Sequence, residues 1–281
     1  MISTAKLDIN TFVNKELPPL PGSAMRVISV LQDDNNSTRT VADAIGLDPM
    51  LTAKILQAAN SPLYALESNV TSLPKAVTTM GNQTIYYMIL AFTAQNAFAQ
   101  EIKNSVVGQT IWEHSLAVGA AAREIGLALG LRGTEELFTC GLLHDIGKLL
   151  FLRYDINLYA ELKDNPFEAD ALAFEKQKFG FTHAQVGGLA VRRWGIPNEI
   201  SYAIANHHNP SEAEQFMLTA RIIDVADEIA NAAGLGVRNP KEMSELLWTE
   251  SVIALKLSLE QIEKVWFKMM TSMQEMTQAF N

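Results

Sequence analysis

The chain has almost no cysteine. Its single cysteine, Cys140, excludes a disulfide within the chain, and such a composition is typical of proteins from a reducing compartment. Long apolar runs are also absent, since none reaches the roughly 18 residues that a membrane-spanning helix needs. At the N-terminus, no apolar stretch is followed by the small-residue cleavage site of a secretory signal. We therefore expect a cytoplasmic protein without a membrane partner.

Basic residues are in the minority. Lys and Arg total 22, Asp and Glu total 31, and the formal net charge is −9. An excess of negative charge argues against nucleic acid as a partner, because DNA and RNA present phosphates. The segment Val41–Leu56 does scan like a helix-turn-helix. From 40 to 57, however, Lys54 is the sole cation, against Asp43 and Asp48. Nucleic-acid binding therefore ranks last among the functions that we consider.

Sustained alternation of apolar and polar residues, which would indicate half-buried strands, is missing too. Apolar side chains instead recur three and four positions apart, for example in Met25–Leu31, Thr52–Ala59 and Leu218–Ala230. Proline and glycine fall mostly between such segments. This pattern predicts an all-α protein, in which many helices of ordinary length are joined by short turns.

Histidine is unevenly distributed along the chain. The first 113 residues contain none, and all five histidines lie between positions 114 and 208. We expect a helical N-terminal lobe over residues 1–104 and a metal-binding lobe over 105–235. The remaining residues, 236–281, are expected to form C-terminal helices that pack on the core.

The histidines occur together with aspartates in a pattern that favours metal binding. The candidate ligands are His114, the pair His144-Asp145, His183, the pair His207-His208 and Asp227. Imidazole and carboxylate suit divalent ions such as iron, manganese and zinc. Neighbouring residues on an ideal helix point about 100° apart. His144 and Asp145 could therefore share a site at a helix end or kink, and Gly147 is consistent with such an irregularity.

These residues resemble two branches of one superfamily. The order His114, His144-Asp145 and Asp227, with the phrase His-Asp-Ile-Gly-Lys at 144–148, resembles the HD superfamily of metal-dependent phosphohydrolases. With His183 and His207-His208 added, the pattern is similar to the HD-GYP branch. The N-terminal half instead resembles the HDOD (HD-related output domain) family, in four phrases: Leu17–Pro21, Val41–Pro49, Lys54–Pro62 and Ser72–Val77, the last followed by Met80-Gly81. The resemblance extends from about residue 15 to 235.

The resemblance implies a multi-helix HDOD fold, with the N-terminal lobe packed on an HD-like lobe, and a site for two ions. One ion would be held by His114, His144 and Asp227, and the second by His183, His207 and His208. Asp145 would bridge the two ions. Asp224 is the alternative to Asp227, since the two lie three residues apart and share a helix face.

The sequence departs from the patterns of both families. HDOD proteins typically have lost several HD ligands, whereas this chain keeps the whole set. The segment after His207-His208 lacks the Gly-Tyr-Pro motif, which argues against hydrolysis of cyclic di-GMP. Thr110 stands where HD-GYP members with three metals tend to carry Glu, which argues against a third ion.

Two functions follow from these observations. One is a signal-transduction protein that also hydrolyses a phosphoester or nucleotide, with Asp145 and Lys148 as catalytic residues. Lys148 lies one turn beyond His144 and could offer its ammonium to a phosphate oxygen, although a solvated surface lysine is an equal alternative. The other function is a catalytically silent module that binds signalling partners and whose metal site is structural or vestigial. Substrate access discriminates between them, because an N-terminal lobe lying across the ligands would block it.

Overall fold

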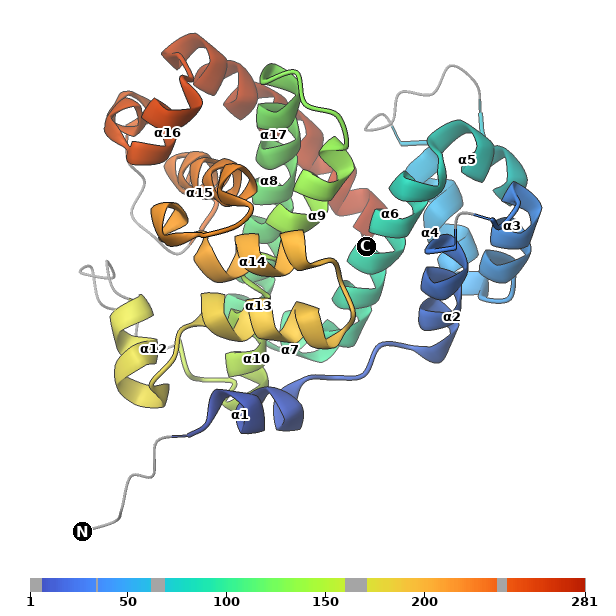
Figure 1. The fold of residues 1–281 in the computed structure, drawn as a ribbon, viewed down its shortest axis with the longest axis horizontal. Helices are drawn as coiled ribbons and strands as arrows, with labels where there is room; N and C mark the ends of the chain where they lie inside the picture. Colours follow the sequence, from blue (N-terminus) through green and yellow to red (C-terminus); the bar gives the residue numbers. More distant parts are fainter. Residues whose placement is uncertain (1–6, 34, 62–68, 160–170, 237–241, 281) are drawn as a thin grey trace.

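The computed structural model describes residues 7–33, 35–61, 69–159, 171–236 and 242–280, with side chains to 273. The prediction of an all-α protein is confirmed, because no strand occurs in these ranges. Figure 1 shows helices packed around α8, which runs through the middle of the molecule. Within the described part of the chain, no helix is both long and apolar enough to cross a bilayer.

The N-terminal helices lie together on one side of the molecule (Figure 1). They are α2 (Gly22–Leu31), α3 (Thr38–Gly46), α4 (Pro49–Ala59), α5 (Leu73–Met80) and α6 (Asn82–Ala97). Local chemistry fixes where two of them begin. The Ser37 side chain accepts a hydrogen bond from the backbone of Thr40 and so caps α3, and Asp48 caps α4 in the same way. Pro49 follows Asp48, in the first helical position that proline favours.

The first helix, α1 (Ile9–Glu16), packs away from these helices. It contacts α10 (Ile146–Tyr154) and α13 (His183–Arg193), below which it lies in Figure 1. The ring of Phe12 lies 5.4 Å, centroid to centroid, from the rings of both Phe151 and Phe181. The indole Nε1 of Trp194 donates a 3.0 Å hydrogen bond to the carbonyl oxygen of Pro18. An aromatic cluster thus holds the start of the chain against its second half.

In the second half, α8 (Val106–Ala128) packs against α7 (Ala99–Asn104), α9 (Thr134–Leu143) and α15 (Met217–Ala232). Helix α14 (Asn198–Asn206) packs on α13 and α15. The remaining elements are α12 (Ala171–Phe179) and the short η1 (Pro210–Glu212) before α15. Glycine permits the close approach of α8 and α9. A Cβ atom on Gly141 would lie 2.8 Å from the Cα of Gly119, closer than two carbon atoms can pack.

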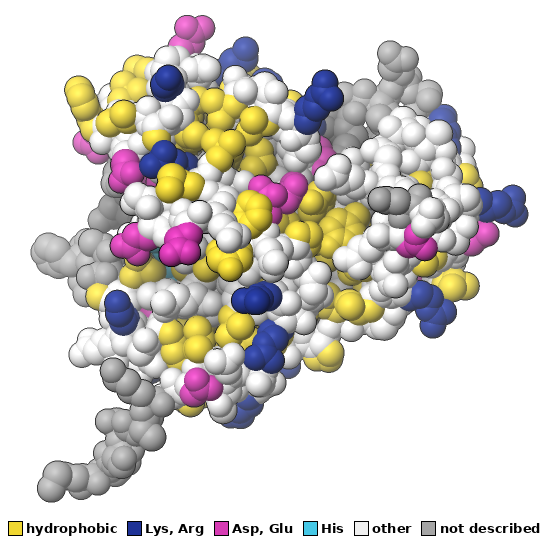
Figure 2. Space-filling view, viewed as in Figure 1, with side chains coloured by type: hydrophobic (Ala, Val, Ile, Leu, Met, Phe, Trp, Pro, Cys, Tyr) yellow, Lys and Arg dark blue, Asp and Glu magenta, His cyan; other side chains and the backbone are white. Residues whose placement is uncertain are grey.

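The C-terminal helices are η2 (Met243–Trp248), α16 (Glu250–Leu255) and α17 (Leu259–Phe280), of which α17 packs along α8. Figure 2 shows hydrophobic side chains at the surface over the region of α15 and α16, and the exposed apolar residues of these elements and of η2 include Leu218, Trp248 and Ile253. The expected division at residue 104 falls between α7 and α8. That division stays a prediction.

Candidate metal centre

The ends of several helices meet at the candidate ligands. His114 lies on α8 and Asp227 on α15, whereas His144 ends α9 and Asp145 directly precedes α10. The helix breaks between His144 and Asp145, so the two adjacent side chains can reach the same centre. Almost no histidine surface is visible on the face drawn in Figure 2. The side chains of His144, Asp145, His183 and His207 are buried, so the centre lies between the helices and not at the surface.

The first ligand group consists of His114, His144 and Asp227. One donor atom from each lies within 4.8 Å of the other two. Asp227 Oδ1 lies 2.9 Å from His114 Nε2 and 3.8 Å from His144 Nε2. The other ring nitrogen of His114, Nδ1, lies 2.5 Å from the carbonyl oxygen of Leu235, and it donates there. His114 therefore presents Nε2 to the group.

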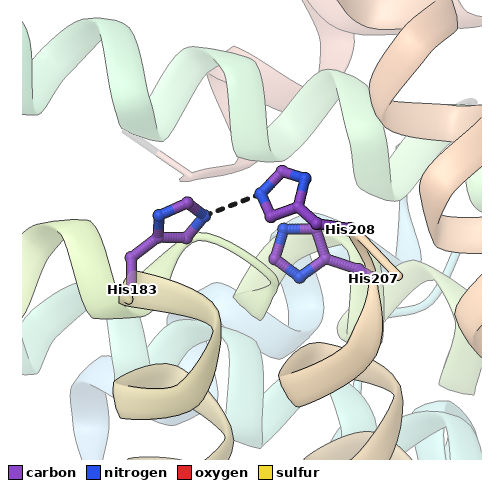
Figure 3. Close-up of side chains that lie close together, drawn as sticks. All are labelled: His183, His207 and His208. Carbon is purple, nitrogen blue, oxygen red and sulfur yellow. Dashed lines mark hydrogen bonds between the residues drawn. The ribbon is translucent and has the colours of Figure 1, made fainter. Parts of the chain in front are cut away.

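The second ligand group consists of His183, His207 and His208, whose donor atoms also lie within 4.8 Å of one another. His183 comes from the first turn of α13, and the other two follow the end of α14. Figure 3 shows the rings of His183 and His208 facing each other. Their Nε2 atoms are 2.9 Å apart.

Asp145 lies between the two groups. Its Oδ2 is 3.4 Å from His144 Nε2 in the first group, and its Oδ1 is 3.2 Å from His183 Nε2 in the second. Lys148 Nζ donates a 2.5 Å hydrogen bond to Oδ2. Burial raises the pKa of Asp145, but the charges of His144, Lys148 and His183 outweigh burial and hold that pKa well below its usual value. Asp145 is therefore an ionised carboxylate that can face both groups.

Three buried atoms of the centre lack a hydrogen-bond partner among the described residues: Nε2 of His144, Nε2 of His207 and Oδ1 of Asp145. The Nδ1 atom of each histidine lies 2.6 Å from a backbone carbonyl oxygen, that of Gly141 for His144 and that of Ile204 for His207. Each Nδ1 therefore carries the proton, and each Nε2 presents a lone pair. An unpaired buried polar atom costs about 1–3 kcal/mol. Bound cations would satisfy these atoms, so the residues present fit divalent metal ions.

Sequence reasoning missed Glu175, which orients His183. Glu175 is fully buried and accepts hydrogen bonds from His183 Nδ1 at 2.8 Å, from the His183 backbone N–H at 2.7 Å and from the Tyr159 hydroxyl at 2.7 Å. Burial raises the pKa of Glu175, but the neighbouring His183 outweighs it and lowers that pKa. Carboxylates that hold the far nitrogen of a ligating histidine are a common support of metal sites. No sequence motif marks this residue.

Asp224 does not join the centre. Its Oδ2 accepts a 2.5 Å hydrogen bond from Ser251 on α16. Asp227 instead accepts a 2.8 Å hydrogen bond at Oδ1 from the side-chain amide of Asn231, one turn further along α15. Of the two aspartates, only Asp227 belongs to a ligand group.

A small pocket leads to the first ligand group. Its lining includes Thr110, His114, Lys148 and Gly236, together with both aspartates of the centre. The space within it is about 10 Å³, which is room for about one water molecule. None of the described residues that line it comes from α1 to α6, so the described part of the N-terminal helices does not line this approach.

The buried His207 is expected to make the metal-free protein less stable in acid. Burial, together with the neighbouring His144 and His183, lowers the pKa of His207 to about 3. An unfolded histidine titrates near pH 6.5. Between these values only the unfolded state takes up the proton, so the free energy of unfolding falls as the pH drops from about 6.5 toward 3, by at most about 1.4 kcal/mol per pH unit.

Urea unfolding of chelator-treated protein at pH 7, 6 and 5 would measure this dependence. His207→Gln is the control, because it removes this titration and leaves the others. Burial lowers the pKa of His183, but the neighbouring Glu175 outweighs burial and raises it. Protonation of His183 therefore stabilises the folded state as the pH falls, in wild type and in the variant alike. An equal pH dependence in wild type and variant would show that His207 is not the residue responsible.

Comparison with solved structures supports the fold. A protein from Shewanella amazonensis SB2B named "Putative phosphohydrolase" aligns with a TM-score of 0.78 at 25% identity, over 97% of this chain and 98% of that one. An HDOD domain protein of unknown function from Geobacter sulfurreducens aligns with a TM-score of 0.74 at 24% identity, over 97% and 98% of the two chains. Both chains match almost end to end.

Sequence comparison finds longer relatives and a family. An uncharacterized protein from Treponema pallidum is 22% identical over 213 residues, which are 72% of this chain and 39% of the relative. Ribonuclease Y from Thermus thermophilus is 31% identical over 163 residues, 57% of this chain and 23% of that protein. The chain thus spans less than half the length of either relative. The family model of the HDOD domain matches residues 17–210, more than half of the chain. The chain therefore belongs to the HDOD domain family.

Proposed function

We propose that this HDOD protein acts in signal transduction, binds two divalent transition-metal ions and hydrolyses a phosphoester or nucleotide. One observation carries the proposal. Nε2 of His144, Nε2 of His207 and Oδ1 of Asp145 are buried in one centre without hydrogen-bond partners. Retaining three unsatisfied polar atoms in a core is costly unless a ligand pairs with them.

Each residue of the centre has a proposed role. His114, His144 and Asp227 would hold one ion, His183, His207 and His208 the other, and Asp145 would contact both. Bound ions of this class supply an acidified water and neutralise charge on a phosphoryl group. Lys148 is 8% exposed and lines the pocket beside His114, where its ammonium could bind a phosphate oxygen.

The relatives support a phosphoester substrate. The similar Shewanella protein carries the name "Putative phosphohydrolase", and the matched Thermus thermophilus relative is a ribonuclease. The proposal of protein partners in signalling rests on the family and on a structural neighbour from Marinobacter aquaeolei VT8 that is named "Putative signal transduction protein".

A second candidate function is a catalytically silent module with a structural metal site. The narrow pocket favours it, because about 10 Å³ admits no phosphoester, and catalytic metal sites need an open position. In this alternative the ions stabilise the helix ends, and the protein acts only through its partners.

Metal analysis and a hydrolysis assay test the proposal together. Wild-type protein, reconstituted under reducing conditions, is expected to hold about two equivalents of a transition metal and to hydrolyse bis-p-nitrophenyl phosphate. The double variant His144→Ala/Asp145→Ala is expected to lose both properties. Elemental mass spectrometry that finds no metal in the wild type would refute both candidate functions. Metal without hydrolysis of any phosphoester in a substrate panel would favour the silent module.

A further inference from the structure

The carboxylate of Glu175 holds His183 at two points, the backbone and the ring. His183 is the first residue of α13, and the N–H groups in the first turn of a helix have no partner within that helix. Glu175 Oε2 accepts the hydrogen bond from this N–H at 2.7 Å and also lies 2.8 Å from the ring nitrogen Nδ1. One buried oxygen therefore fixes both the start of α13 and the direction of the imidazole ring.

Tyr159 holds Glu175 in turn, from the turn that follows α10. Its hydroxyl donates a 2.7 Å hydrogen bond to Glu175 Oε1, and both side chains are buried, Glu175 completely. An ionised carboxylate only accepts hydrogen bonds, and a buried charge without partners is strongly unfavourable. Tyr159 and His183 together therefore keep a negative charge in the core, directly behind a candidate metal ligand.

The two ligand groups differ in what stands behind their histidines. In the first group, the Nδ1 atoms of His114 and His144 lie against backbone carbonyl oxygens. In the second group, Nδ1 of His183 lies against the carboxylate of Glu175. The first group has Asp227 among its members, whereas the second consists of three histidines. Glu175 thus brings to the second group a negative charge that none of its three members carries.

We propose that Glu175 and Tyr159 are positioning residues for the ion of the second ligand group, an inference that rests on the proposed two-ion centre. Neither residue would touch the ion. Glu175 would hold Nε2 of His183 toward the centre and make the imidazole a stronger ligand, because a negative charge at Nδ1 raises the basicity of Nε2. Tyr159 would keep Glu175 in place for this contact. The first ion would depend on neither residue.

Equilibrium dialysis of the metal-free protein against cobalt(II), followed by elemental mass spectrometry, measures the affinity for each ion. Glu175→Gln removes the charge and keeps the size of the side chain, and we expect the affinity for one ion to fall about 10- to 100-fold. Tyr159→Phe removes one hydrogen bond to Glu175, and we expect a fall of about fivefold. The affinity for the other ion is expected to stay unchanged in both variants.

Two variants that keep a single ion assign the effect to one ligand group. Asp227→Ala is expected to keep only the ion of the second group, and His208→Ala only the ion of the first. Adding Glu175→Gln is expected to weaken cobalt binding in the Asp227→Ala protein and to leave it unchanged in the His208→Ala protein. A residue that merely stabilised the fold would affect both proteins alike.

Glu101→Gln is the matched control, because Glu101 is also a buried carboxylate. It accepts a 2.9 Å hydrogen bond from Arg153 and belongs to neither ligand group, so both affinities are expected to stay as in wild type. Circular dichroism confirms that each variant is folded.

The outcomes separate this inference from the proposed function. If wild type binds two cobalt ions and Glu175→Gln binds both equally well, the inference is overturned and the proposed function stands. The same holds if Glu175→Gln weakens binding equally in the two single-ion proteins. Wild type that binds no cobalt would overturn both.

Discussion

Replacing Asp227 by alanine is expected to remove metal from the first ligand group, while the same replacement at Asp224 leaves metal content unchanged. The two aspartates lie three residues apart on α15, so the pair is closely matched in sequence and helix position. Asp227 Oδ1 lies 2.9 Å from His114 Nε2, whereas Asp224 hydrogen-bonds Ser251 on α16. We expect metal content in Asp227→Ala to fall from about two equivalents to about one or fewer.

Elemental mass spectrometry on both variants, purified and reconstituted beside wild type, measures this difference. Thermal unfolding of the same samples distinguishes loss of a ligand from loss of the fold. Equal metal content in the two variants, whether both lose metal or both keep it, would contradict the assignment of Asp227 as a ligand.

Gly147→Ala is expected to destabilise the protein by about 3 kcal/mol, near the upper end of overpacking effects. A Cβ atom at this position would overlap the carbonyl oxygen of His183. Gly147 on α10 and His183 on α13 meet through backbone atoms. No flexible side chain can therefore move aside to make room for the added methyl group. The substitution must push α13 away from α10 and, with it, His183 away from Asp145.

Urea unfolding of the metal-free protein measures this effect without a contribution from bound ions. Gly22→Ala is the matched control, because a Cβ atom there meets nothing within 4 Å and alanine favours the helix by about 0.4–1 kcal/mol. If Gly147→Ala unfolds at the same urea concentration as Gly22→Ala, the close approach of α10 and α13 is not rigid.

The sequence predicted the all-helical fold because apolar spacing is a local pattern. The spacing of apolar residues predicts a helix whichever elements that helix packs against. The candidate ligands were implied by the resemblance to the HD superfamily, and they stay a prediction, although the structure brings their donor atoms together. The pair His144-Asp145, followed by Gly147, indicates a helix break at the centre. Glu175 could not be predicted in this way. It stands in the charged stretch Glu175–Lys178, which is typical of a solvated helix face, and its burial depends on Tyr159 and His183 from other segments.

Long-range contacts also decide two further features that the sequence alone could not predict. Helical spacing places Asp224 and Asp227 on one face, and the choice between them depends on Ser251, a residue of another helix. The position of α1 could not be predicted from the sequence either, because its amphipathic pattern fits any apolar surface. The aromatic cluster around Phe12 holds it against α10 and α13, together with hydrogen bonds from Arg193 to the side chains of Asn10 and Asn14.

The packing of α1 has a consequence for how the chain folds. Phe12 lies far ahead of Phe151, Phe179 and Phe181 in the sequence, yet its ring contacts all three. The contact closes a loop that contains every helix from α2 to α9, and the entropic cost of such closure grows only slowly with loop length. Because Phe12 packs among residues of the second half, that half cannot complete its aromatic cluster without α1.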